Sequence, residues 1–227
     1  MIVMSGASGG LGGYLIERLG KDQQIIGTYN NHKPESSDPQ VPLYQVNVCD
    51  SASVERFVDQ VGQSLQRLTL INLAGISLDG MGHKMGEAIW DSVLDTNLKG
   101  AFLMSRALLP FMREQEWGRI INISSVVGQM GVPGTCAYSA SKAGLAGLTR
   151  TLAVENATKN ITVNTLALGY YKIGMIGAID PSIQEQIRAT IPMRRFGDPK
   201  DVEVGIRFLI ECDYITGSVV NINGGLL

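Results

Sequence analysis

The sequence predicts an α/β protein built on a doubly wound parallel sheet of about seven strands, with helices on both faces. Short apolar runs alternate with amphipathic segments along the whole chain, which is the pattern of a parallel sheet with crossover helices. A glycine-rich stretch follows the first apolar run directly, as in sheets that bind nucleotides. No repeat or linker-like segment interrupts the alternation, so residues 1–227 are expected to form a single domain.

The individual elements follow from hydrophobic spacing and from residues that cap helices. The predicted strands are the apolar runs 2–4, 25–29, 43–48, 69–73, 119–123, 161–167 and 219–222. The predicted helices are 14–19, 51–65, 87–98, 101–112, 138–156 and 201–210. In the helix 87–98, the spacing places Ile89, Trp90, Val93 and Leu94 on the inward face. The polar segment 30–42 is expected to be a loop, and 170–195 is expected to be irregular and partly helical.

Composition and charge exclude several classes of protein. Hydrophobic residues make up 44% of the chain and charged residues 18%, which is ordinary for a soluble globular protein. A formal net charge of −2 predicts no general affinity for nucleic acid or for an anionic membrane. The chain has no apolar run of the roughly 18 residues that span a bilayer, and its N-terminus lacks the pattern of a secretion signal. Cys49, Cys136 and Cys212 share no metal-ligand spacing with the two histidines, so we expect free thiols, no metal and a cytoplasmic protein.

The glycine-rich stretch carries the first functional indication. Glycines at positions 6, 10 and 12 lie between the first strand and the first helix, where they permit a tight turn and a close backbone approach. The N-terminus of the helix then offers free N–H groups and a positive dipole end to a phosphate. This arrangement predicts a Rossmann fold that binds a dinucleotide. The residues expected to hold its phosphates are Gly6, Ser8, Gly9, Gly10 and Leu11.

Small and polar residues also follow several of the other predicted strands. They are Asn47-Val48 after the third strand, 72–75 after the fourth, Ser124-Ser125 after the fifth and Leu168-Gly169 after the sixth. Because ligands bind at the carboxyl ends of the strands in such a sheet, these residues are expected to surround one site.

Tyr138 and Lys142 are the candidates for proton chemistry at that site. A spacing of four residues places them on one face of a helix, one turn apart. A lysine cation near the phenol is expected to lower the tyrosine pKa from its reference of about 10. Ser125, thirteen residues before the tyrosine, is placed to hydrogen-bond a substrate oxygen beside the phenol. The alternative for the pair alone is an ordinary surface contact at the start of a helix.

Taken together, these motifs resemble those of the short-chain dehydrogenase/reductase family, and most of all its 3-oxoacyl-[acyl-carrier-protein] reductases. Residues 5–12 are similar to the TGxxxGxG motif, 72–75 to NNAG, and Tyr138 with Lys142 to YxxxK. Asn97 and Ser125 stand where the family has its helix asparagine and its catalytic serine. The segments 215–217 and 223–225 resemble the C-terminal motif, so the similarity covers nearly the whole chain.

The resemblance implies a mechanism of carbonyl reduction. A nicotinamide near Asn72, Gly75 and Gly169 gives a hydride to a carbonyl carbon, and Tyr138 gives a proton to the oxygen. Ser125 orients that oxygen, Lys142 lowers the tyrosine pKa and holds the nicotinamide ribose, and Asn97 holds a water that links Lys142 to solvent. The further cofactor contacts that the resemblance implies are Asn30, Asn47, Val48, Ala74 and Tyr171. The implied substrate is a small carbonyl compound, including an acyl thioester, and the implied assembly is a homotetramer or a dimer.

Three points stay open. Leu168 and Ile173 replace the family's proline and threonine, which bears on how the nicotinamide amide is held. Strand two ends on Tyr29 rather than an acid, and His32 and Lys33 follow, which favours NADP(H) over NAD(H), although Gly9 replaces a basic residue common in NADP-dependent relatives. The alternatives to a reductase are a dinucleotide-binding sensor or scaffold that has lost activity and an epimerase on the same fold.

Overall fold

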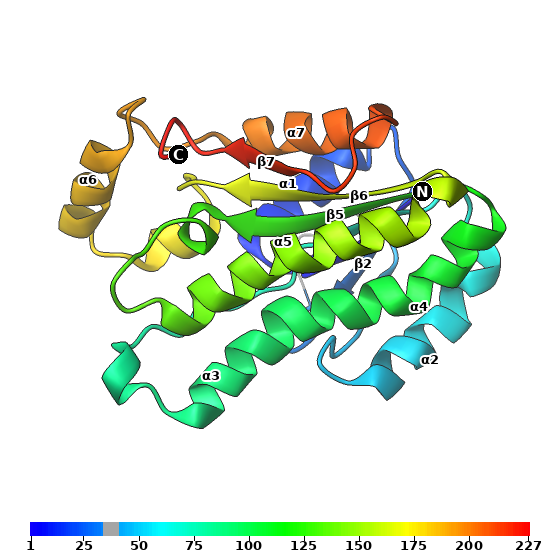
Figure 1. The fold of residues 1–227 in the computed structure, drawn as a ribbon, viewed down its shortest axis with the longest axis horizontal. Coiled ribbons are helices and arrows are strands. Elements are labelled where there is room, and N and C mark those ends of the chain that lie inside the picture. Colours follow the sequence, from blue (N-terminus) through cyan, green and yellow to red (C-terminus); the bar gives the residue numbers. More distant parts are fainter. Residues whose placement is uncertain (34–40) are drawn as a thin grey trace.

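The computed structural model describes residues 1–33 and 41–227, so part of the predicted loop 30–42 lies outside the described residues. Within them, seven parallel strands form one sheet in the order β3-β2-β1-β4-β5-β6-β7 (Figure 1). The strands are β1 Ile2–Ser5, β2 Ile25–Tyr29, β3 Leu43–Gln45, β4 Thr69–Asn72, β5 Gly118–Ser125, β6 Ile161–Leu168 and β7 Val219–Ile222. The predicted doubly wound fold is therefore confirmed.

Helices cover both faces of this sheet. Figure 1 shows α1 and α7 on one face and α2, α4 and α5 on the other. Their bounds are α1 Gly10–Leu19, α2 Ser51–Val61, α3 Glu87–Leu94, α4 Gly100–Glu114, α5 Cys136–Asn156, α6 Pro181–Thr190 and α7 Pro199–Glu211. The two faces bury separate apolar clusters, one centred on Leu70 and Met104 and the other on Met4 and Leu15. The central strands are buried on both sides, as their continuous apolar runs predict.

Several boundaries differ from the predicted ones for local reasons. β3 ends at Gln45 rather than residue 48, because Asn47 turns the chain toward α2 by accepting a hydrogen bond from the Cys49 amide. α6 supplies the helical part of the segment 170–195, which was predicted to be irregular and partly helical. It begins where Asp180 caps the Ser182 amide and Pro181 takes the first helical position.

The prediction of which α3 side chains face inward is partly wrong. Val93 is fully buried, but Ile89 and Trp90 are each 40% exposed. A helix that packs on its neighbour through one narrow stripe leaves the flanking positions uncovered. Phe102 on α4 and Val154 on α5 are also exposed, so all three helices carry apolar side chains that the isolated chain leaves uncovered.

The turn between β1 and α1 is fixed by backbone contacts that only glycine permits. Gly6 has φ +72°, and a side chain there would lie 2.7 Å from the Ala74 backbone after β4. A side chain at Gly12 would lie 2.4 Å from the Gly6 carbonyl oxygen. The N-terminus of α1 therefore packs directly on the ends of β1 and β4.

We expect Gly12→Ala to lower the free energy of unfolding by about 1–3 kcal/mol, because its methyl group meets backbone that cannot move freely. Gly13→Ala is the matched control, since nothing lies within 4 Å of its new methyl group. That variant is expected to be neutral or more stable by up to about 1 kcal/mol, as alanine favours helix over glycine. Urea unfolding of both variants checks this, and equal stability of the two would contradict the packing described.

Candidate active site

The candidate site lies at the carboxyl ends of β1, β4, β5 and β6. Ser5, the last residue of β1, joins two of these ends: its hydroxyl accepts hydrogen bonds from the Leu73 and Ala74 amides at 3.2 and 3.3 Å. The turn after β4 is thereby held against the glycine turn, and the residues predicted on the two turns are brought together.

Ser125 and Tyr138 meet as the sequence predicts. Ser125 is the last residue of β5, and its hydroxyl accepts a hydrogen bond from the Val127 amide at 3.4 Å in the short helical turn Val126–Gly128. Tyr138 lies in the first turn of α5, and its phenol is close enough to the Ser125 side chain for hydrogen bonding from Ser125 to lower its pKa. Two hydroxyl groups thus converge on one point, where a substrate oxygen would receive a hydrogen bond from each.

Lys142 is held to β5 through both its side chain and its main chain. Its ammonium donates to the Ile123 carbonyl at 2.8 Å, and its own carbonyl accepts from the Ser124 hydroxyl at 2.9 Å. Gly128 lets the chain pass close to α5 at this point, because a side chain there would lie 2.8 Å from the Lys142 backbone. The ammonium lies 5.6 Å from the centre of the Tyr138 ring.

The expected lowering of the tyrosine pKa by Lys142 is wrong for the cofactor-free chain. Burial raises the pKa of Tyr138 to about 12, a hydrogen bond with Ser125 acts in the opposite direction, and the charge of Asp79 adds to the rise. Burial also lowers the pKa of Lys142 to about 8. The physical reason is the direction of the Lys142 side chain, because its ammonium faces the Ile123 carbonyl rather than the Tyr138 phenol.

Asn97 is buried in a π-helical turn, Asp95–Lys99, between α3 and α4. Its side-chain oxygen accepts from the Ile76 amide at 2.8 Å, and its side-chain nitrogen donates to the Ile76 carbonyl at 2.9 Å and to Ser141 at 3.0 Å. Both amide protons are therefore engaged with protein groups. A water could therefore only donate to Asn97, either to the second lone pair of its side-chain oxygen or to its main-chain carbonyl, and the water expected at Asn97 stays a prediction.

Two serines support this network: the sequence analysis named Ser124 only as a residue near the site, and it missed Ser141. Ser124 fixes the Lys142 carbonyl, and Ser141 bridges Asn97 and the Tyr138 carbonyl, to which it donates at 2.7 Å. The sequence offered one indication of their importance, since each serine stands directly before a predicted catalytic residue. Sequence spacing alone does not give the direction in which such a side chain points.

The predicted phosphate-binding residues lie together at the N-terminus of α1. Ser8, Gly9 and Gly10 are exposed, and the helix has no side-chain cap, so its first amides are open to a ligand. Leu11 follows in the first turn. Ile173 lies against this turn, because a side chain at Gly10 would lie 3.2 Å from its Cγ1 atom.

Gly75 closes the other side of the candidate site. A side chain there would lie 3.3 Å from the Lys142 ammonium and 3.2 Å from the Asn97 side-chain oxygen. Gly169, after β6, is equally constrained, since a side chain would lie 2.8 Å from the Asn223 backbone.

Asn72 does not face the candidate site, contrary to prediction. Its side chain is buried and donates to Asn122 at 2.8 Å and to Ser105 at 3.2 Å, on the α4 side of the sheet. Asn122 in turn donates to Thr149 of α5 at 2.8 Å. The Asn72 side chain is therefore part of a polar network inside the sheet, and Asn72 can offer a ligand only its main chain.

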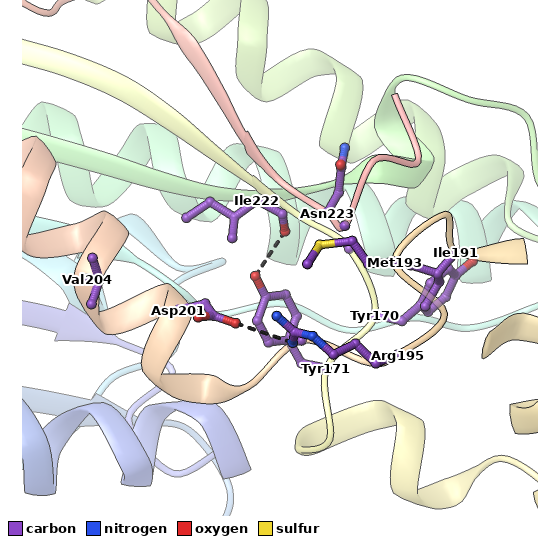
Figure 2. A pocket seen from close by; sticks show the side chains of 12 residues that line it. Tyr170, Tyr171, Ile191, Met193, Arg195, Asp201, Val204, Ile222 and Asn223 are labelled. Carbon is purple, nitrogen blue, oxygen red and sulfur yellow. Dashed lines mark hydrogen bonds and ion pairs between the residues drawn. The ribbon is translucent and has the colours of Figure 1, made fainter.

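Tyr171 is also placed differently from the prediction. Its hydroxyl donates to the Ile222 carbonyl at 2.9 Å, and its ring packs on Gly197. Figure 2 shows it in the wall of a cavity of about 370 Å³ at the ends of β6 and β7, beside the ion pair of Arg195 and Asp201. Because burial and the nearby charge of Asp201 raise the pKa of Tyr171, its hydroxyl stays protonated and is engaged within the protein.

The remaining predicted contacts lie on the β2–β3 side. Asn30 is exposed at the end of β2, and its carbonyl accepts from Gln45 at 3.0 Å. Asn47 is exposed, whereas the Val48 side chain is buried, with the Cγ2 atom 2.8 Å from where a side chain at Gly100 would begin. Val48 can therefore offer a ligand only its main chain.

No metal site or membrane span is found in the described part of the chain. Residues 1–33 and 41–227 contain no group of three or more histidine, cysteine, aspartate or glutamate side chains placed to hold an ion. The helices among them are too short or too polar to cross a bilayer. Cys49, Cys136 and Cys212 are free.

The fold and the site define a Rossmann-type α/β protein with an open glycine turn and a serine–tyrosine pair at the same edge of the sheet. A family model described as "Enoyl-(Acyl carrier protein) reductase" matches residues 22–227. The chain belongs to the short-chain dehydrogenase/reductase family of oxidoreductases.

Individual relatives agree with this assignment. The 3-oxoacyl-[acyl-carrier-protein] reductase FabG of Rickettsia conorii is 38% identical over 231 residues, covering 99% of this chain and 95% of that protein. Nodulation protein G of Azospirillum brasilense is 38% identical, with 99% and 96% covered. The FabG of Thermotoga maritima is 41% identical, with 86% and 78% covered.

The buried lysine gives the cofactor-free chain an expected pH dependence. The folded chain releases the Lys142 proton near pH 8, whereas the unfolded chain keeps it to about 10.5. The unfolded state thus holds more protons in this window, so stability rises from pH 8 toward 10, by at most about 3 kcal/mol. Above pH 10 the raised pKa of Tyr138 reverses the trend, since only the unfolded chain then loses the phenol proton.

Urea unfolding followed by tryptophan fluorescence between pH 7 and 10 measures this effect. Lys142→Met is expected to remove the rise, and Lys84→Met, at an exposed lysine, is expected to keep it. An unchanged pH slope in Lys142→Met would show that the ammonium is solvated in the folded chain.

Proposed function

We propose that this chain is an NAD(P)-dependent reductase that converts a carbonyl group, in a 3-oxoacyl thioester or a small ketone, into a secondary alcohol. The observation that carries the proposal is the convergence of the Ser125 and Tyr138 hydroxyls beside Lys142 and next to the open glycine turn. The relatives' names, which describe reductases of acyl-carrier substrates, support the same reaction class.

The proposed steps use the chain's own groups. The dinucleotide supplies the hydride when bound. Ser125 orients the carbonyl oxygen, on which negative charge develops, and Tyr138 donates the proton. With the pKa of Tyr138 raised to about 12, the phenol is protonated at neutral pH and ready to donate. Lys142, whose ammonium lies 5.6 Å from the centre of the Tyr138 ring, would hold the nicotinamide ribose when the dinucleotide is bound, and a water at Asn97 would link it to solvent.

The family model and the curated relatives carry different reaction names, and the geometry favours one. An enoyl reductase adds hydride to a carbon–carbon double bond, whereas a 3-oxoacyl reductase adds it to a carbonyl carbon. Two hydroxyl donors converging on one oxygen are suited to a carbonyl that becomes an alcohol. The expected preference is thus acetoacetyl-CoA over crotonyl-CoA as test substrate.

Two alternatives remain distinct from this proposal. A dinucleotide-binding sensor or scaffold would bind the cofactor without turnover, and an epimerase would turn over without net consumption of it. The intact Ser125, Tyr138 and Lys142 set argues against the first. The uncovered apolar side chains of α3, α4 and α5 support a homodimer or homotetramer, and we place the protein in the cytoplasm.

Tyr138→Phe tests the mechanism. It is expected to lower kcat for acetoacetyl-CoA reduction by at least about 10³-fold, because the phenol proton beside Ser125 is removed. Dinucleotide binding, followed by quenching of tryptophan fluorescence, should stay within about threefold of the parent, since the ring remains. Near-parent turnover by this variant would refute the assigned proton donor.

Cofactor choice is tested separately at the end of β2. We propose NADP(H) over NAD(H), since Tyr29 leaves no acid to repel a 2′-phosphate and His32 and Lys33 are exposed beside it. Lys33→Glu is expected to raise the KM for NADPH about tenfold and to leave that for NADH within about twofold. Equal effects on both cofactors, or a parent that prefers NADH, would contradict the assignment.

A further inference from the structure

Ser141 is a buried hydroxyl that the proposed mechanism does not use. It is fully buried on α5, between the two predicted catalytic residues of that helix. Its hydroxyl donates to the Tyr138 carbonyl at 2.7 Å and accepts from the Asn97 side chain at 3.0 Å. Because the single hydroxyl proton goes to Tyr138, the hydroxyl can only accept from Asn97, and this fixes which way the Asn97 amide is turned.

The orientation of that amide decides the position of the chain after β4. With its nitrogen toward Ser141, Asn97 presents its oxygen to the Ile76 amide and a second N–H to the Ile76 carbonyl. Asn97 also lies against Gly75, which borders the Lys142 ammonium. Ser141 thus joins three segments through one hydrogen-bonded path: the first turn of α5, the π-helical turn and the 75–76 loop.

We propose that Ser141 is a positioning residue for the reaction, acting through Asn97 on Gly75, Ile76 and Lys142. Its effect on turnover rests on the proposed function; its effect on the 75–76 loop does not. Without the hydroxyl, one Asn97 N–H is left buried and unpartnered, so the amide turns and the loop loses its fixed distance from Lys142.

The chain contains a closely matched control residue. Ser105 on α4 is also fully buried, donates to a carbonyl one turn earlier, that of Ala101, at 2.7 Å, and accepts from an asparagine side chain, Asn72, at 3.2 Å. Its partners lie inside the sheet rather than beside the candidate site. Loss of either hydroxyl removes one bond to a main-chain carbonyl and one from an asparagine side chain, although the Asn72 nitrogen also lies 3.4 Å from the Ala101 carbonyl. A difference in turnover between two variants of similar stability therefore reports the position of the hydroxyl.

The experiment compares Ser141→Ala with Ser105→Ala in the full-length chain. Both are expected to lower the unfolding midpoint by similar amounts. Ser141→Ala is expected to lower kcat for acetoacetyl-CoA about 10- to 100-fold with KM changed less than about threefold, and Ser105→Ala is expected to keep kcat within about twofold. Ser141→Thr, which keeps the hydroxyl, should recover kcat.

Amide hydrogen exchange supplies a readout that needs neither cofactor nor activity. The Ile76 amide is expected to exchange about tenfold faster in Ser141→Ala and at the parent rate in Ser105→Ala. If Ser141→Ala does not fold, Ser141→Cys gives the same comparison with a weaker hydrogen-bonding group in its place. Parent-like exchange at Ile76, or a kcat equal to that of Ser105→Ala, would overturn the proposal.

A parent chain without reductase activity would instead refute the proposed function. The exchange comparison would still decide whether Ser141 positions the loop, so the two failures are distinguishable.

Discussion

The docking of α5 on β5 is the contact on which the rest of the site depends. Lys142 is held to the strand through both its ammonium and its carbonyl, and Gly128 allows the backbones to approach closely enough for this. Tyr138 precedes Lys142 by one turn, so the same contact sets the phenol beside Ser125 at the end of the strand. A rigid helix on a buried strand therefore does the positioning that mobile loops cannot do.

The fold could be predicted because its signals are local and redundant. Parallel strands buried on both faces appear as continuous apolar runs, and the intervening helices have their own period, so strand order and handedness follow with few choices. The glycine turn was placed correctly for the same reason. Segment 170–195 was predicted to be partly helical, but the bounds of α6 were not predicted, since its start depends on a cap at Asp180 and its faces are largely exposed.

The sequence predicted where the residues of the candidate site lie, but not the directions in which their side chains point. Ser125, Tyr138 and Lys142 come together because strand ends meet at one edge of the sheet. Asn72 and Tyr171 lie at the same edge, yet their side chains turn into the protein, and which side a residue faces depends on register and packing rather than on spacing. The prediction of a lowered Tyr138 pKa was wrong for a similar reason, because burial outweighs the effect of a Lys142 ammonium that points away from the phenol.

The π-helical turn Asp95–Lys99 has a consequence for how this chain tolerates changes in length. Such a turn holds one residue more than the α-helical turn that it replaces. Loss of a single residue there would leave a continuous helix, but everything before it would rotate by about 100° relative to α4. The exposed apolar residues Ile89 and Trp90 would turn to another side of the helix, and Asn97 would lose its bonds to the 75–76 loop. The extra residue of the π-helical turn thus sets how the exposed side chains of α3 are rotated relative to α4 and the candidate active site.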